Sequence, residues 1–115
     1  MSSTRFLTYA VSDLKAARHF YEDMLGLKPA HEPAGDWCEY NVGDITFGIC
    51  RADAQHPAGV PDALLSFEVS DLDAEVARLH QLGATFDREI THTPECRFAI
   101  VRDPDGSEVI LHKSK

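Results

Sequence analysis

Apolar residues first recur along the chain with the period of a strand and then with the period of a helix. This pattern of strand and helix occurs twice. An apolar run from Phe6 to Val11 is typical of a strand, and a stretch with helical spacing follows it. The apolar positions of that stretch are Leu14, Ala17, Phe20, Tyr21, Met24 and Leu25. The second copy predicts a strand over Leu64 to Val69 and then a helix with an apolar stripe of Leu72, Val76, Leu79 and Leu82. Both helices are expected to pack one face onto a sheet.

The same tetrapeptide, Val-Ser-Asp-Leu, joins strand to helix in both copies, at residues 11–14 and 69–72, an offset of 69 − 11 = 58. Serine and aspartate are preferred helix N-caps, so the Ser-Asp pair predicts the start of each helix. Gly26 and Gly83 each follow a leucine at the end of the helical stripe, and glycine commonly ends a helix there. The chain therefore contains an internal repeat of strand and helix.

Three shorter apolar segments follow each helix and predict further strands. They are Leu27 to His31, Trp37 to Val42 and Ile45 to Cys50 in the first half, and Thr85 to Glu89, Arg97 to Arg102 and Glu108 to His112 in the second. Gly43-Asp44 and Asp103-Pro104-Asp105-Gly106 supply hairpin turns. The expected fold class is α+β, with two βαβββ modules at about 4–50 and 62–113, a linker at 51–61, and one domain over residues 1–115.

The amino-acid composition and the net charge exclude some classes of binding partner. The 115 residues carry 19 acidic and 11 basic side chains, a formal net charge of −8, which repels phosphate backbones and anionic membranes. No apolar run is long enough to cross a bilayer. The three cysteines are an odd number without CxxC spacing, and the amino terminus lacks a secretory pattern, so we expect a cytoplasmic protein. Neither nucleic acid nor a membrane is an expected partner.

A family resemblance rests on two motifs and the repeat. VSDLxxAxxFYxxxLGL follows the first strand, and DPDGSEVIL leads into the last. The duplicated βαβββ unit with these motifs resembles the vicinal oxygen chelate superfamily, which includes glyoxalase I, extradiol dioxygenases and bleomycin-resistance proteins. The resemblance covers nearly the whole chain. It implies modules whose sheets curl into a cup around a ligand cavity, and a homodimer in chains of this length.

The same resemblance implies one divalent metal, held by a histidine of a module's first strand and a glutamate of its last. Counted from the two motifs, these positions fall on Phe6, Leu64, Ile110 and, within one residue, Gly48. None of these side chains has a lone pair for a metal. The sequence therefore predicts no metal and no cofactor, and favours the ligand-sequestering branch typified by bleomycin-resistance proteins.

Candidate ligand-binding residues follow from strand alternation around these positions and from the aromatic residues of the strands. They are Phe6, Thr8, Trp37, Tyr40, Leu64, Glu68, Cys96, Phe98, Ile110 and His112. Glu68 is a possible anchor for a basic ligand group, and the alternative is a solvated carboxylate at a strand end. His112 is the best candidate for a general base, and the alternative is that it is a solvated histidine near the end of the chain. The offset of 58 also relates Cys38 to Cys96, so both thiols are candidates for lining the cup.

The predicted function is metal-free binding of a small molecule, with cationic or aromatic compounds as the expected ligand class. The alternative is an enzyme, a lyase or dioxygenase with a relocated site built from Glu68, Cys96, Glu108 and His112. A third possibility is a subunit whose partner protein supplies the chemistry. The sequence alone does not identify the ligand.

Overall fold

The structure, a computed structural model, describes residues 5–33, 35–54, 57–59 and 64–115, with the backbone alone at Arg5 and Phe6. The chain divides into two compact units, residues 1–63 and 64–115, and each contains one copy of the repeat. Part of the expected linker, at residues 55–56 and 60–61, lies outside the described residues. No helix in the described ranges is long and apolar enough to cross a membrane.

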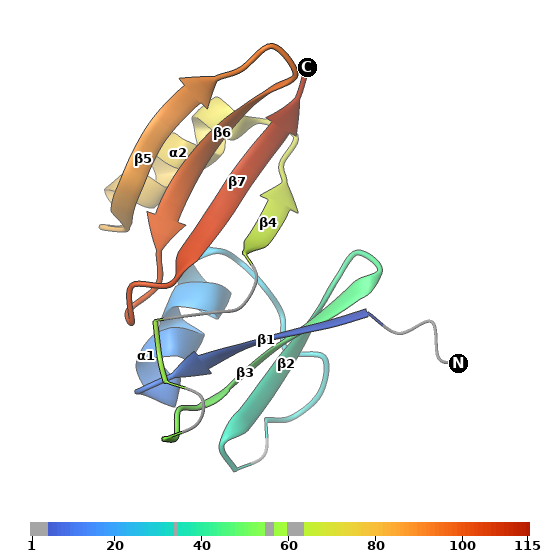
Figure 1. Cartoon of the computed structure of the whole chain (residues 1–115), viewed down its shortest axis with the longest axis vertical. Coiled ribbons are helices and arrows are strands. Elements are labelled where there is room, and N and C mark those ends of the chain that lie inside the picture. The colour runs from blue at the N-terminus through green and yellow to red at the C-terminus, as the bar shows by residue number, and fades with distance from the viewer. Residues whose placement is uncertain (1–4, 34, 55–56, 60–63) are drawn as a thin grey trace. The chain divides into compact units, whose positions relative to one another are not determined.

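The first unit is a three-stranded sheet with one helix (Figure 1). β1 (Arg5–Val11) is followed by α1 (Leu14–Arg18), which continues without a break into the π-helix η1 (His19–Met24). β2 (Trp37–Val42) and β3 (Ile45–Arg51) complete the sheet, whose order is β1-β3-β2. β1 and β3 are parallel, and β2 and β3 form an antiparallel hairpin.

The second unit repeats this arrangement with a fourth strand (Figure 1). Its elements in chain order are β4 (Leu65–Glu68), α2 (Leu72–Gln81), β5 (Thr85–His92), β6 (Cys96–Arg102) and β7 (Glu108–Ser114). The sheet order is β4-β7-β6-β5, with β4 parallel to β7 and the other pairs antiparallel. The expected α+β class with mixed sheets is confirmed.

One expected strand is wrong. The segment from Leu27 to His31 forms only an isolated bridge between Pro29 and Tyr40, with the Ala30 amide donating to the Glu39 carbonyl at 2.8 Å. Proline has no amide hydrogen to donate to a ladder, so Pro29 interrupts the pairing that a strand here needs. The first unit is therefore βαββ, and only the second has the full βαβββ order.

Both helices begin and end as their residues predict. The carboxylates of Asp13 and Asp71 accept from the amides of Ala16 and Ala74, at 3.1 and 3.0 Å, as N-caps. Gly26 and Gly83 both have a φ of +82°, a left-handed conformation that glycine adopts without steric cost. Because these signals are local, they act the same way in both copies.

In each unit the helix covers one face of the sheet, and the hydrophobic core of that unit lies between its helix and its sheet. In the first unit the Phe47 ring meets those of Tyr9 and Tyr21, with centroids 5.3 and 5.0 Å apart. In the second unit, α2 buries the face that carries Leu65, Ala99, Val101, Val109 and Leu111. The alternate residues of each strand therefore point to the other face, which we call the open face.

Glu22 ties the π-helix to the sheet of the first unit. Its carboxylate accepts from the Arg18 guanidinium at 2.7 and 3.2 Å and from the Tyr40 hydroxyl at 2.8 Å. Burial alone disfavours the charged form of Glu22, but the bonds from Arg18 and Tyr40 outweigh it and lower the pKa of this carboxyl. The ionised Glu22 is thus a structural anchor between helix and strand.

We expect Glu22→Gln to lower the free energy of unfolding at neutral pH by about 1–3 kcal/mol, because it weakens hydrogen bonds to a charged group. The folded-state pKa of Glu22 is depressed, so its contribution is present above the ordinary value of 4.5 and is lost as the pH falls through the folded value. Urea unfolding at several pH values measures both effects. Asp23→Asn is the matched control, since that side chain is 70% exposed and forms an ion pair with His19 on the helix surface. Equal losses in the two variants would contradict the anchoring role.

Candidate functional site

The open face of the second unit brings together six of the ten candidate residues. In register, Glu68 lies beside His112, His112 lies opposite Phe98, and Ile110 forms the next row with Ile100. Cys96 is on the same face of β6, two residues before Phe98, and Leu64, just before β4, is 50% exposed. The six residues are Leu64, Glu68, Cys96, Phe98, Ile110 and His112.

Thr8 and Trp37 lie on the open face of the first unit, on β1 and β2. Thr8 is exposed and pairs with Gly48, which in turn pairs with Glu39. Phe6 is in register with Thr46, but its side chain lies outside the part that the structure describes.

Tyr40 leaves the candidate set, because it is fully buried on the helix-covered face against Tyr21 and Phe47. Its pKa, raised by burial, marks a phenol that stays protonated. Trp37 and Tyr40 are three residues apart on one strand, so alternation alone puts them on opposite faces.

The expected equivalence of Cys38 and Cys96 is wrong. Gly48 pairs with Thr8 and Ile110 with Ser66, so Gly48 and Ile110 do occupy matching places. Their partners on the next strand are Glu39 and Ile100, which gives an offset of 100 − 39 = 61 instead of 58.

Three extra residues before β6 thus shift its alignment with β2, and the counterpart of Cys38 is Ala99. Cys38 is buried on the helix side, where burial raises its pKa, whereas Cys96 is on the open face. The same shift makes Trp37 and Phe98 equivalent, so each open face carries one aromatic residue at the same place.

A carboxylate cluster on the first open face was not expected. Glu39 accepts from the Trp37 indole N–H at 2.9 Å with one oxygen and contacts Nε2 of His31 at 2.7 Å with the other. The bond from Trp37 and then that from His31 lower the pKa of Glu39, and the bond to Glu39 raises the pKa of His31. Strand alternation puts Glu39 on the face of Trp37, a signal present in the sequence, but His31 reaches it from a segment with no such pattern.

The second open face carries a different cluster around Glu68, on β4. One oxygen contacts Nδ1 of His112 at 2.5 Å, and the other accepts the Ser114 amide at 3.0 Å. The Ser114 bond and then the His112 bond lower the pKa of Glu68, so the carboxylate is ionised at neutral pH. Among the side chains that the structure describes, each open face therefore presents an aromatic ring and a carboxylate held by hydrogen bonds, although Glu39 and Glu68 do not occupy equivalent places.

One surface hollow includes Glu68, and another lies on the helix of the first unit. The hollow of about 410 Å³ lies where β4 meets α2 and is lined by Glu68, Val69, Ser70, Asp71, Ala74, Glu75 and Arg78. Arg78 is paired with Glu75 at 2.5 Å, so the hollow as a whole is acidic.

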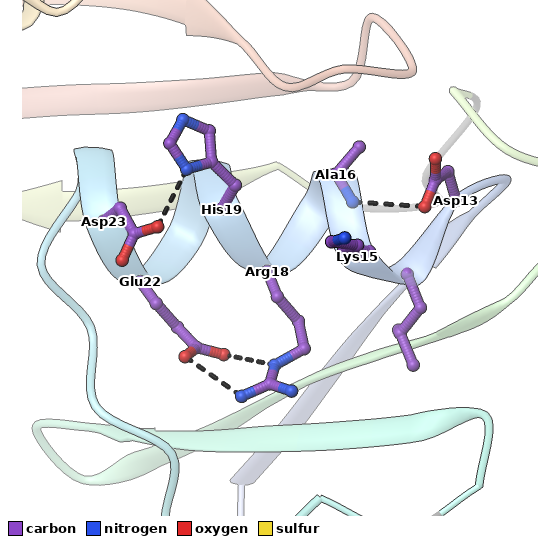
Figure 2. A pocket seen from close by; sticks show the side chains of 8 residues that line it. Asp13, Lys15, Ala16, Arg18, His19, Glu22 and Asp23 are labelled. Carbon is purple, nitrogen blue, oxygen red and sulfur yellow. Dashed lines mark hydrogen bonds and ion pairs between the residues drawn. The ribbon is translucent and has the colours of Figure 1, made fainter.

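The other hollow, of about 730 Å³, runs along α1 and η1 (Figure 2). Four of its charged or titratable side chains pair along the helix, Arg18 with Glu22 and His19 with Asp23. We place no chemistry in this second hollow.

None of the described residues form a group of three or more His, Cys, Asp or Glu side chains arranged to hold a metal ion. Leu64, Ile110 and Gly48, at the positions that the resemblance assigns to metal ligands, carry no donor side chain, and neither does Phe6. The described residues therefore do not fit the metal that the resemblance implies.

Known proteins resemble this chain over most of its length. It is 30% identical over 107 residues to the anthracycline biosynthesis protein DauV of Streptomyces sp. strain C5, an alignment that covers 91% of this chain and 39% of that protein. The chain thus spans well under half of that relative. Among solved structures, TnmS3, an antibiotic binding protein from Streptomyces sp. CB03234, superposes with a TM-score of 0.85 at 25% identity, over 100% of this chain and 98% of that one.

Lactoylglutathione lyase from Agrobacterium tumefaciens has the same fold, with a TM-score of 0.78 at 22% identity over 98% of this chain and 94% of the other. The family model that describes the Glyoxalase/Bleomycin resistance protein/Dioxygenase superfamily matches residues 5–111. With this match over nearly the whole chain, and with the paired strand and helix units that carry it, the protein belongs to the Glyoxalase/Bleomycin resistance protein/Dioxygenase superfamily.

Proposed function

We propose that the protein binds planar small molecules, preferably cationic ones, on the open faces of its sheets, without a metal. The observation that carries this proposal is that each open face has an aromatic ring and a held carboxylate close to it. Trp37 stands two residues from Glu39 on one strand, and Phe98 lies opposite His112, the partner of Glu68. Aromatic faces stack on planar ligands, and carboxylates attract amines.

The negative charge of the protein and its similarity to known proteins support the same ligand class. The acidic hollow beside Glu68 and the net charge of −8 both favour a cation over a phosphorylated compound. TnmS3 is an antibiotic binding protein, and DauV takes part in anthracycline biosynthesis. Anthracyclines combine a planar ring system with an amino sugar, so they suit an aromatic and acidic surface. We therefore take a cationic anthracycline as the first ligand to test.

The ligand test is a fluorescence titration with doxorubicin, whose amino sugar is cationic, and with its uncharged aglycone. We expect Glu68→Gln to weaken doxorubicin binding about tenfold, or about 1.4 kcal/mol, and to leave the aglycone within about twofold. At a hundredfold excess over its Kd, doxorubicin should add about 2.7 kcal/mol to the free energy of unfolding. Asp23→Asn removes one negative charge from the exposed face of η1 and is the matched control. An equal loss with Asp23→Asn would mean that only bulk charge matters.

We further propose that the protein is a homodimer. Phe98, Ile100 and Ile110 are apolar, lie on the open face of the second unit and are each partly exposed. A second copy could pack on Ile100 and Ile110 through an apolar interface of the obligate kind and leave Phe98 facing a ligand cavity between the two copies. We expect light scattering at protein concentrations between about 1 and 100 μM to give twice the monomer mass, because an obligate interface persists on dilution over this range. A monomer throughout that range would contradict the proposal.

The proposed absence of a metal has its own test. We expect untagged purified protein to contain far less than one equivalent of Zn, Ni, Fe or Mn, and chelator to leave its melting temperature unchanged. The reason is the donor set, since Phe6, Gly48, Leu64 and Ile110 offer no ligand atoms in their side chains. Elemental analysis is the measurement. A stoichiometric metal that disappears when His112 and Cys96 are replaced would instead favour an enzyme with a relocated site.

A further inference from the structure

Glu68 and His112 form a carboxylate–imidazole dyad across two parallel strands. The two residues are register partners on β4 and β7, and Nδ1 of His112 lies 2.5 Å from Oε1 of Glu68. Glu68 cannot turn freely, because its second oxygen accepts the Ser114 amide at 3.0 Å. An ionised carboxylate only accepts hydrogen bonds, so the imidazole nitrogen that faces it carries the hydrogen. In the neutral ring, Nε2 then has the free lone pair.

The neighbours of His112 on the open face are mostly apolar. Phe98 is its register partner on β6, and Ile110 and Ile100 form the adjacent row. Other charged groups of this face lie further from His112: Arg88 on β5 is the register partner of Ile100, and Glu108 and Arg102 are register partners at the far end of β7, where Arg102 forms an ion pair with Asp87 at 2.8 Å. The His112 side chain is 34% exposed, which leaves it accessible to a small molecule. A planar molecule on Phe98 would therefore meet the imidazole edge beside the apolar side chains of Phe98 and Ile110.

Other histidines of the described chain make carboxylate contacts of a different kind. His31 and His80 contact Glu39 and Glu89 through Nε2, the nitrogen that would have to be free. His19 does use Nδ1, toward Asp23, but both side chains are about two-thirds exposed on a helix surface. His112 combines the Nδ1 contact, a carboxylate held by a second bond and apolar neighbours. His19 is therefore a natural internal control.

We propose that His112 acts through Nε2 as a general base on a bound molecule, and that Glu68 is its positioning residue. The substrate class is a neutral planar compound with an acidic C–H or O–H bond. The proton moves to Nε2, and the electron pair of the broken bond stays on the substrate as an enolate or phenolate. Glu68 balances the charge of the imidazolium, which returns the proton to product or water. The step needs no further reactant, and it rests on the proposed function only in that the substrate uses the same open face.

The first test uses the free protein and needs no ligand. Long-range ¹H–¹⁵N correlation spectra report which ring nitrogen of each neutral histidine carries the hydrogen. We expect His112 to be fixed as the Nδ1–H form, and Glu68→Ala to abolish that preference while Asp23→Ala leaves it unchanged. Hydrogen on Nε2 of His112, or a form that does not respond to Glu68→Ala, would overturn the proposal.

The second test measures proton transfer with 5-nitrobenzisoxazole, a neutral planar carbon acid. Removal of its ring C–H proton forms a nitrile and breaks the N–O bond, which releases a coloured phenolate. We expect turnover above that of equimolar free imidazole, and a loss of about 100-fold or more in His112→Gln, the lower range for a general base. Glu68→Gln should lower kcat with KM unchanged, because the ring is misoriented but the binding surface remains.

His19→Gln should match the wild-type protein in this reaction, since its imidazole lies outside the proposed site. Wild-type turnover no faster than free imidazole, or a His112→Gln variant as fast as wild type, would overturn the proposal. The doxorubicin titration is read separately. If the protein fails to bind doxorubicin but keeps the fixed tautomer and the His112-dependent turnover, the proposed ligand class fails and the base stands. If the protein binds doxorubicin but shows no His112-dependent turnover, the proposed ligand class stands and the general-base proposal fails.

Discussion

Side-chain alternation along the strands is the constraint on which the rest of this structure depends. One helix covers each sheet, so only every second strand residue is buried beneath it, and its neighbours point to the open face. On β7, Val109 and Leu111 belong to the core, while Ile110 and His112 between and beside them do not. The stability of each unit and its capacity for chemistry are thus carried by different residues of the same strands. A change on the open face can alter function without removing core volume.

Three carboxylates illustrate how surroundings set the role of one residue type. Glu22 lies at the junction of helix and sheet, where Arg18 and Tyr40 occupy its oxygens, and it serves the fold. Glu39 and Glu68 are on open faces, where N–H donors hold them ionised at a surface. All three have a lowered pKa, but Glu22 joins helix to strand, whereas Glu39 and Glu68 lie on the open faces. Position in the fold, more than acidity, therefore separates structure from candidate function.

The positions that the family resemblance assigns to metal ligands illustrate how a fold persists when its chemistry changes. Gly48 and Ile110 match each other in register, as the repeat requires, although neither side chain can bind a metal. Hydrogen bonding between strands does not depend on those side chains, so the sheets form without them. Two residues beyond Ile110, His112 meets Glu68 and provides polar groups at a new place on the same face. The fold thus constrains where chemistry can arise and not which chemistry it is.

The sequence by itself determined what depends on local geometry. The capping aspartates, the helix-ending glycines and β2, which runs from Trp37 to Val42 as expected, follow from residue type and short-range period. Prediction from the sequence failed at Leu27 to His31. Hydrophobicity suggested a strand there, but Pro29 lacks the amide hydrogen that strand pairing requires.

Only the tertiary structure decided which distant residues meet. It showed that β6 is shifted by three residues against β2, so Cys38 and Cys96 are not equivalent, and it joined His31 to Glu39 and His112 to Glu68. Such contacts depend on connection lengths and strand register, which are set by the packing of the whole sheet. No local pattern in the chain encodes them.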